Sequence, residues 1–178
     1  MEFLDVIDER DEVIGKASKQ DIYKRLLSHR IVHIFIFNDK EEMALQLRSN
    51  NVPFCPLHWC TAAAGHVQSG ESYEQAAMRE MKEEIGTTTK IEFLHKDIYV
   101  YGNQYDNDNE NNKIGLRNGL KKMIATFRCE YNGPFNIDPD EVYQVEFFTM
   151  GKIQEMINKG ENIHPETLFL LRKHFGIQ

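Results

Sequence analysis

The sequence predicts an α+β domain with a mixed β-sheet, and three observations lead to this fold class. Runs of β-branched and aromatic residues fill the middle of the chain, as in "IVHIFIFN" at 31–38. Segments rich in good helix formers are inserted between these runs and follow them. The chain has 178 residues, 41% of them hydrophobic, and contains no Pro/Gly/Ser-rich linker, so we expect one domain with one core.

The first 28 residues are expected to form a hairpin and a short helix. The segment "FLDVIDERDEVIGKAS" at 3–18 contains two strand-like runs around the turn-like "DERDE". The segment "KQDIYKRLLSH" at 19–29 has Ile22, Leu26 and Leu27 at helical spacing. We divide the single domain 1–178 into the hairpin and helix 1–28, a core 29–150 and C-terminal helices 151–178.

Further strands are expected through the core, and helices after it. After the buried strand at 31–38, "EMALQLRS" at 42–49 alternates like its hairpin partner. The later strand segments are 90–102 (one or two strands), 121–131 and 141–150. A short amphipathic helix at 151–160 precedes a helix at 165–176, which starts at Pro165 and has one apolar face formed by Leu168, Leu171 and Phe175.

Composition excludes several classes of function. A net charge of −7 argues against a nucleic-acid polymer as partner, although a bound metal could still supply positive charge to a phosphate substrate. Cys55, Cys60 and Cys129 form no CxxC pair, so we expect reduced thiols in a cytoplasmic protein. The sequence contains no apolar run of the roughly 18–20 residues that cross a bilayer and no secretory leader at its start, so no membrane partner is expected.

The segment "NQYDNDNENNKIGLRNG" at 103–119 is rich in Asn and Asp and has no apolar periodicity. It is expected to be a loop between two strands. Two alternatives remain open for it, a surface loop without function or a lid that contributes to substrate specificity.

Residues 72–85 are expected to form a helix that carries three glutamates on one face. Ser72 is suited to the N-cap and Gly86 to the C′ position. Glu80, Glu83 and Glu84 are spaced i, i+3 and i+4, so their carboxylates lie side by side. The helix is expected to turn an apolar stripe inward, formed by Tyr73, Ala76, Ala77 and Met81.

These glutamates have two interpretations. They can form a solvated face that pairs with Arg79 and Lys82, or they can bind a cation. Like charges four residues apart repel one another, and carboxylates near a helix C-terminus oppose the helix dipole. Because both effects destabilise the helix, the presence of all three glutamates favours the interpretation that they bind a cation. Clustered carboxylates suit Mg²⁺ or Mn²⁺.

The spacing of the segment resembles the signature box of the Nudix hydrolases, at residues 65–87. Gly65 is followed after five residues by Glu71, and after seven more by "REMKEEIG" at 79–86, with only Thr87 departing from the usual aliphatic residue. The resemblance implies an α/β/α sandwich with a mixed sheet, in which a strand–loop–helix unit carries the metal ligands.

Site roles follow from the same resemblance. It implies that Glu80, Glu83, Glu84 and the Gly65 carbonyl bind Mg²⁺ or Mn²⁺, and that Glu80 is also a candidate general base. It further implies that Arg79 and Glu71 orient and neutralise these glutamates. The implied chemistry is attack of water on a diphosphate bridge.

Most of the chain resembles one branch of the family, the isopentenyl-diphosphate-isomerase-like proteins, on segments such as "SHRIVHIFIFN", "AAAGHV" and "GPFNIDPDEVYQVEFF". This branch contains isomerases and hydrolases. An isomerase would need a catalytic Cys where this chain has Ala64. Cys60 would share a strand face with Ala64 but lie about 13 Å away, and a buried core thiol is its simpler interpretation.

The metal cluster of the isomerases is also incomplete in this sequence. His29 and His66 match two of its His positions, but the third falls near Ile22. Its two Glu positions fall near Leu120 and Lys122, where a lysine would repel a metal. The box glutamates are intact, so we expect a hydrolase rather than an isomerase.

Candidates for substrate binding are weaker. The proposed residues are His66, Trp59, Tyr105 and Glu141. Each has a simpler alternative: His66, like His29, can be a hydrogen-bonded structural residue, and Trp59 can pack in the core. Tyr105 can be a chance match, and Glu141 can be a surface carboxylate. Phe54 is a further candidate for stacking on a base, Tyr101 shares the chance match of Tyr105, Glu146 is an alternative to Glu141, and His33 is expected in the core or a cleft.

The predicted function is therefore a metal-dependent pyrophosphohydrolase that cleaves a nucleoside diphosphate linked to another moiety. Isopentenyl-diphosphate isomerase activity and non-catalytic nucleotide sensing are the alternatives. The expected partner is a small-molecule diphosphate, and a homodimer through the apolar C-terminal helix stays open.

Overall fold

The computed structural model describes residues 2–102 and 119–178. In this part of the chain, seven strands form one mixed sheet and two more form a separate hairpin. The sheet strands are β3 (His29–Phe37), β4 (Met43–Arg48), β5 (Trp59–Thr61), β6 (Ala63–His66), β7 (Glu92–Val100), β8 (Lys121–Glu130) and β9 (Val142–Phe148). The hairpin strands are β1 (Phe3–Ile7) and β2 (Val13–Ser18), and the helices are α1 (Lys19–Arg25), α2 (Tyr73–Ile85), α3 (Met150–Asn158) and α4 (Pro165–His174).

The strand β3 organises the sheet. It runs parallel to β8 along its whole length, from the pair His29/Lys122 to the pair Phe37/Glu130. Along its other edge, β3 pairs antiparallel with β6 in its first half and with β4 at its end. The β4 strand continues the sheet by pairing with β5 and β9, and β7 pairs with β8 at the opposite side. The sheet is therefore mixed, as the sequence predicts.

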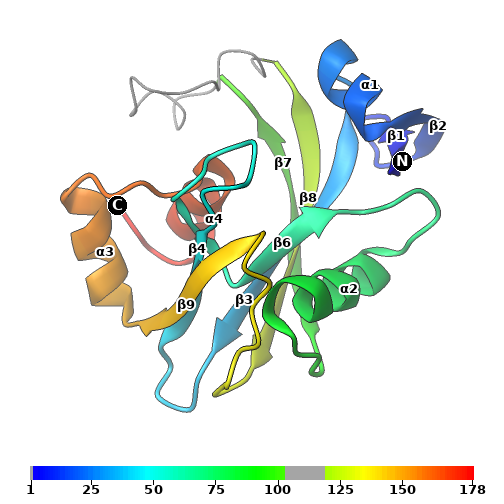
Figure 1. The fold of residues 1–178 in the computed structure, drawn as a ribbon. Helices are drawn as coiled ribbons and strands as arrows, with labels where there is room; N and C mark the ends of the chain where they lie inside the picture. Colours follow the sequence, from blue (N-terminus) through cyan, green and yellow to red (C-terminus); the bar gives the residue numbers. More distant parts are fainter. Residues whose placement is uncertain (1, 103–118) are drawn as a thin grey trace.

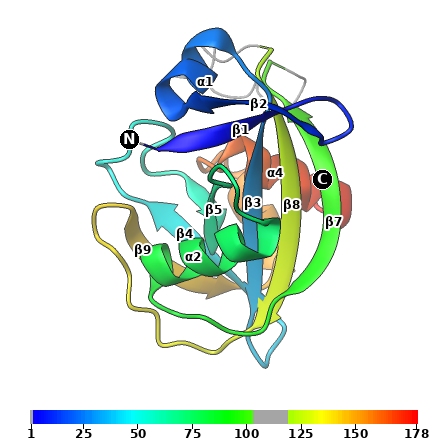
Figure 2. The same cartoon turned by 90° about the vertical axis from the view of Figure 1, so that its right-hand side faces the viewer.

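Side chains alternate along β3 between two apolar layers, as the period of two requires. Ile31 and Phe35 pack in a cluster that includes Phe169 and Leu170 of α4. Val32 and Ile34 pack in the cluster that includes the apolar stripe of α2. Figures 1 and 2 show α2 and α4 on opposite faces of the sheet. This arrangement confirms the predicted α+β fold with a sheet between helices.

The N-terminal hairpin is fastened to the core by Asp11, which lies in its turn. Arg30 of β3 donates from Nε to Asp11 Oδ1 at 2.6 Å, and Lys96 of β7 donates to Oδ2 at 2.6 Å. The hydroxyl of Tyr73, at the start of α2, donates to the same carboxylate at 2.9 Å. One side chain thus joins the hairpin to three elements of the core, across which the hairpin lies in Figure 2.

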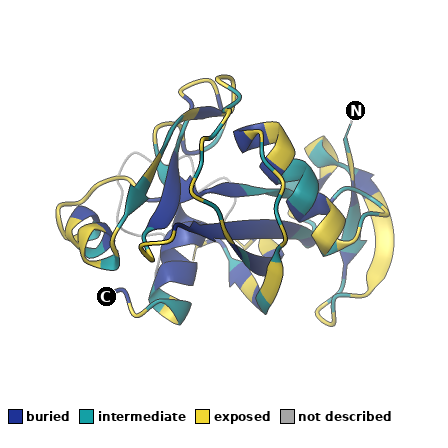
Figure 3. Cartoon of the chain, turned by 90° about the horizontal axis from the view of Figure 1, so that it is seen from below, coloured by how far each residue is buried: buried dark blue, intermediate teal, exposed yellow. Residues whose placement is uncertain are grey.

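Three expectations about the elements need correction. Cys60 and Ala64 lie on two strands rather than on the single strand expected for them, because the chain changes partner at Ala62, from β4 to β3. The first helix ends at Arg25, since Leu26 adopts a left-handed conformation with φ of 55°. The helix α4 is buried on all sides from Pro165 to Leu171, not on one face, because it packs against the sheet on one side and, through Leu168, against Met156 of α3 (Figure 3).

None of the helices among the described residues is both long enough and apolar enough to cross a membrane.

Candidate functional site

The helix α2 has strong local signals at both ends. The hydroxyl of Ser72 accepts from the Gln75 amide and the Gln75 side chain accepts from the Ser72 amide, which completes a capping box. At the other end Gly86 has φ of 67°, and a Cβ there would lie 2.5 Å from the carbonyl oxygen of Asn136. With Ala76, Ala77 and Met81 buried against the sheet, the neighbouring face of the helix presents the glutamates.

Gly65 of β6 lies directly beside Glu80 of α2. A Cβ added at Gly65 would lie 2.1 Å from the Cδ and Oε1 atoms of Glu80, far closer than two such atoms can approach. The lack of a side chain at Gly65 therefore gives the Glu80 carboxylate its space next to the β6 backbone. The structure thus brings the Gly65 main chain and the Glu80 side chain together.

Arg79 holds three acidic side chains together. Its Nε and Nη2 atoms each donate to one oxygen of Glu71 at 2.9 Å, a bidentate pair. Its Nη1 atom donates to Glu80 at 2.7 Å and to Glu83 at 3.1 Å. Nη2 also donates to the His66 carbonyl at 2.8 Å, which fixes the guanidinium against β6. The guanidinium thus binds Glu71 along its Nε–Nη2 edge and orients Glu80 and Glu83 through Nη1.

Glu84 is the most enclosed of the three glutamates, with 6% of its surface exposed. Its Oε2 atom accepts from the Gln46 side chain at 2.9 Å and from the Ala64 amide at 3.1 Å. Gln46 lies on β4 and Ala64 on β6, the two strands that pair with the same edge of β3. Both strands therefore donate a hydrogen bond to the Glu84 carboxylate.

Burial strongly affects the charges of these groups. It raises the pKa of Glu84 to about 8, and the negative charge of Glu80 adds to the effect. Burial also raises the pKa of Glu80 to about 7, against the opposing influence of Arg79. Glu71 differs, because its hydrogen bonds with Arg79 hold its pKa below the usual range. One buried carboxylate (Glu84), one partly buried carboxylate (Glu80) and one exposed carboxylate (Glu83) lie together, and Arg79 neutralises only part of their charge.

These residues fit a divalent cation. The donors are carboxylate oxygens on adjacent turns of one helix, with a backbone carbonyl next to them, and hard cations such as Mg²⁺ and Mn²⁺ prefer oxygen ligands. A cation would also offset the burial of Glu80 and Glu84, whose ionised forms are disfavoured without one.

The glutamates line one part of a cavity of about 540 Å³. This volume is within the range of small-molecule sites in proteins. Cationic and aromatic side chains contribute to the remaining wall, notably Lys19, Tyr23, Arg48, Phe54 and Lys122. The carboxylates and the cationic groups therefore share one space.

A buried charge cluster closes part of this cavity. Glu166 of α4 is 3% exposed and pairs with the Lys122 ammonium of β8 at 2.8 Å. The ring of His33 on β3 donates from Nε2 to the other Glu166 oxygen at 3.2 Å, and the Tyr101 hydroxyl donates to the same oxygen as Lys122. Burial alone would raise the pKa of Glu166, but Lys122 and His33 hold it well below its usual range.

His29 and His66, which match positions of the isomerase metal cluster, lie together in the structure. Their rings stack with centroids 5.4 Å apart. Tyr23 packs edge-on against both rings and shares a hydrogen bond of 2.6 Å with His66 Nε2. Ile22, at the third histidine position, is fully buried. The pair therefore packs with an aromatic side chain where the isomerases carry a ligand set.

The weaker predictions of substrate-binding residues have different outcomes. His66 and Glu141 line the cavity. Trp59 is instead partly buried and packs against the apolar core, edge-on to Phe148 at 5.1 Å, which is the packing alternative. Tyr105 and nearly all of the loop 103–119 lie outside the described residues.

Positions of three other candidates are also defined. Glu146 is exposed and accepts from Gln144, away from the described wall of the cavity, whereas Phe54 and His33 are part of that wall. Cys60 lines the cavity as well, although it lies on β5 and Ala64 on β6, so the estimate of distance along one strand does not apply. Burial raises the pKa of its thiol, which contacts Thr61 and Thr167.

Sequence reasoning missed several residues of the site. Gln46 could have been found, since it is a polar residue between Leu45 and Leu47 on a strand predicted to alternate. Glu166 was harder to recognise as a site residue. It follows Pro165 in the first turn of a predicted helix, where a carboxylate commonly serves only to stabilise the helix dipole. Asp138 lines the cavity together with Glu141. It lies far from the box in sequence, so nothing in the sequence indicated that it would reach the cavity.

Comparisons with known proteins agree with this geometry. Residues 27–171 match the sequence profile of the NUDIX domain. A Nudix hydrolase of Nostoc sp. is 28% identical, over 99% of this chain and 97% of its own. Isopentenyl-diphosphate Delta-isomerase 2 of Photorhabdus laumondii is 34% identical, over 92% of this chain and 86% of its own. The crystal structure of DR0079 from Deinococcus radiodurans has a TM-score of 0.75 at 22% identity, covering 97% of this chain and 99% of that one, which shows a shared fold.

Proposed function

Because the chain belongs to the Nudix family and is a hydrolase that acts on diphosphate-containing substrates, we propose that it is a Mg²⁺- or Mn²⁺-dependent pyrophosphohydrolase. The proposed substrate is a nucleoside diphosphate linked to another moiety. The observation that carries the proposal is the set of three α2 glutamates beside Gly65 at the wall of a 540 Å³ cavity. The three buried free thiols among the described residues support a reducing compartment such as the cytoplasm.

Each box residue has a proposed role. Glu80, Glu83, Glu84 and the Gly65 carbonyl would hold the cation. When bound, the cation would neutralise diphosphate oxygens and lower the pKa of the attacking water. Glu80 is the proposed general base, supported by its place in the cavity wall and by the hydrogen bond from Arg79 that orients it. Arg79 and Glu71 would keep Glu80 and Glu83 oriented through the hydrogen bonds described above.

The remaining cavity wall supports a substrate larger than a bare diphosphate. Arg48 is anchored by its hydrogen bonds to the Phe54 carbonyl at 3.2 and 3.3 Å, which positions a guanidinium where it could meet phosphate oxygens. Phe54 and Tyr23 offer aromatic surface for a base or another flat group. His66 and Glu141 are proposed as further polar contacts to the substrate.

The test is a screen for product release with dinucleotides, nucleotide sugars and coenzyme A derivatives, each with Mg²⁺ or Mn²⁺. Glu83→Gln and Glu84→Gln should reduce turnover of the best substrate by roughly 10²–10⁴-fold, since they remove charge from the proposed reacting centre. Glu74→Gln is the matched control, because Glu74 lies exposed in the first turn of the same helix. Equal activity in all three variants would contradict the proposal.

Isomerase activity is the second candidate, favoured by the 34% identity with the Photorhabdus isomerase. Two features of this chain oppose it: Ala64 offers no thiol, and Lys122 pairs with Glu166 where the isomerases carry a carboxylate ligand. Incubation with isopentenyl diphosphate should give no dimethylallyl isomer. If the isomer forms, the Cys60→Ala variant will show whether the cavity thiol replaces the missing one. Ligand-induced thermal stabilisation without any product would indicate a sensor.

A further inference from the structure

The strand β7 contains a bulge that turns two polar side chains toward α4. Phe93 pairs with Phe127, but His95 pairs with the next residue of β8, Thr126, so the register shifts between them. Phe93 contacts Phe127 on the α2 side of the sheet, whereas Tyr99 packs in the α4 cluster. His95 and Asp97 follow the alternation of Tyr99, and therefore face α4. Bulges often redirect side chains at functional sites.

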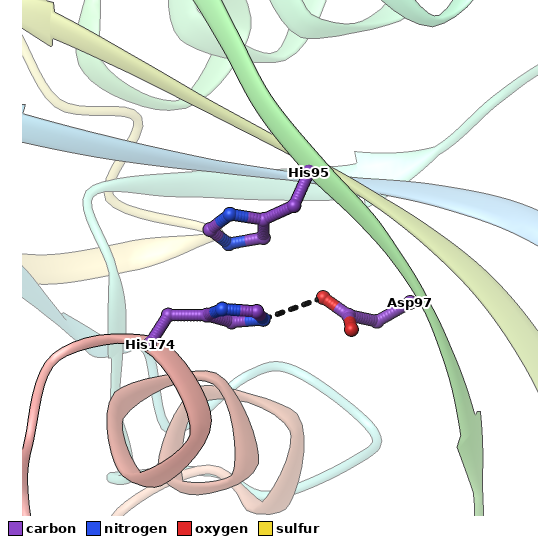
Figure 4. Close-up of side chains that lie close together, drawn as sticks. All are labelled: His95, Asp97 and His174. Carbon is purple, nitrogen blue, oxygen red and sulfur yellow. Dashed lines mark hydrogen bonds and ion pairs between the residues drawn. The ribbon is translucent and has the colours of Figure 1, made fainter.

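His174 in the last turn of α4 completes a cluster with these two residues. One ring nitrogen of each histidine and one oxygen of Asp97 all lie within 4.8 Å of one another. His174 donates from Nε2 to Asp97 Oδ2 at 2.8 Å. The ring of His95 lies over the ring of His174, with centroids 3.5 Å apart (Figure 4). The cluster joins the edge of the sheet to the end of the C-terminal helix.

The cluster contains a polar atom that the fold does not satisfy. His95 Nε2 is buried and has no hydrogen-bond partner among the described residues. A buried polar atom without a partner is costly, and an absent ion is one explanation for it.

We propose that His95, Asp97 and His174 form a second metal site, which binds one borderline-soft divalent cation such as Zn²⁺ and fastens α4 to the edge of the sheet. Two imidazoles and one carboxylate suit Zn²⁺ rather than Mg²⁺. Lys173 pairs with Asp97 Oδ1 at 2.6 Å, which leaves Oδ2 for the cation. Binding exchanges the His174 hydrogen bond for a metal bond and opens the ring stack by rotation about the broad χ2 torsions.

The second site is separate from the glutamates of α2. That helix packs on the other face of the sheet, and the described wall of the cavity includes none of the three residues. The two sites also differ in donors, since oxygen ligands dominate one and imidazoles the other. Their cations can therefore be loaded independently.

The test is calorimetric titration of the full chain with Zn²⁺ in the presence of excess Mg²⁺, which competes for oxygen-donor sites. The wild-type protein should bind one Zn²⁺ that His95→Gln and His174→Gln each weaken by roughly tenfold or more, the effect of losing groups at a metal site. His58→Gln is the control, because His58 is a partly exposed histidine whose ring contacts the Pro56 carbonyl. Lys173→Met should strengthen Zn²⁺ binding, since it removes the positive charge that the ammonium places beside the Asp97 carboxylate.

A measurement on the wild-type chain guards against variants that fail to fold. Zn²⁺ should shift the imidazole NMR resonances of His95 and His174 more than those of His58. Equal Zn²⁺ binding by His95→Gln, His174→Gln and His58→Gln, each melting normally in EDTA, would overturn the proposal. So would wild-type spectra in which the His95 and His174 rings do not respond.

Discussion

Gly65 illustrates at the residue scale how one missing side chain shapes the site. The Glu80 carboxylate occupies the space that a Cβ at Gly65 would need, 2.1 Å from Glu80 Cδ. The glycine was predictable from its place in the box. The physical reason for it was not, because that reason lies in a contact between β6 and α2 that only the folded chain contains.

The Gly65→Ala variant follows from this contact. Glu80 must move away from the β6 backbone, so we expect turnover to fall by about 10²-fold, as for misplacement of a reacting group by about 1 Å. The melting temperature should change little, because Glu80 can move toward the cavity. Steady-state kinetics beside a thermal melt separates the two effects. Wild-type turnover in Gly65→Ala would show that this close approach has no role in catalysis.

The three glutamates could be placed on one face from their spacing alone, but their surroundings could not. Glu83 is solvent-exposed, whereas Glu84 is enclosed by Gln46 and the Ala64 amide. Gln46 lies on β4, which is distant from α2 in sequence, and Ala64 lies on β6, which precedes α2 and packs beside it. Burial of this kind depends on tertiary packing, which spacing within one helix does not reveal.

At the scale of elements, most strands and helices agree with the sequence pattern. The separation of Cys60 on β5 from Ala64 on β6 was missed because it reflects a change of pairing partner rather than a local breaker. The bulge of β7 was missed because it is a shift of register against β8, its partner throughout, and no residue of the segment signals such a shift locally. The ends of α2, in contrast, were predictable from Ser72 and Gly86, because capping is local.

Asp11 gives the element-scale prediction. Burial alone would raise its pKa, but hydrogen bonds from Lys96, Arg30 and Tyr73 outweigh burial and hold the pKa below the usual range. Asp11→Asn removes the charge that these donors need, so it should lower the free energy of unfolding by about 1–3 kcal/mol at neutral pH. Urea denaturation measures this value. Glu9→Gln is the control, because Glu9 lies in the same hairpin turn and forms an exposed ion pair.

The pH dependence of this difference follows from the lowered pKa. The folded protein binds the Asp11 proton more weakly than the unfolded chain, so the charged carboxylate stabilises the fold fully above about pH 4. That contribution is lost as the pH falls through the lower folded value. The stability gap between wild type and Asp11→Asn should therefore narrow in acid. A gap that widens in acid would contradict the assigned contacts.

At the scale of the whole molecule, the cavity combines two kinds of electrostatic environment. The α2 glutamates provide an anionic wall, and the Lys122–Glu166–His33 cluster provides a buried, internally neutralised one. The sequence indicated that Lys122 would repel a metal. It did not indicate that α4 would bring Glu166 to 2.8 Å from this lysine, because that pairing joins residues 44 positions apart and depends on where α4 packs.

The most direct test of the central claim is hydrolysis of the best substrate from the screen in ¹⁸O-labelled water. We predict that, with Mg²⁺ or Mn²⁺, each cleaved bond places one ¹⁸O atom in one phosphate product, read by mass spectrometry. EDTA should abolish this product, and Glu84→Gln should slow its formation by roughly 10²–10⁴-fold. Turnover that proceeds without a divalent cation, or that incorporates no ¹⁸O, would contradict metal-dependent attack of water at the α2 glutamates.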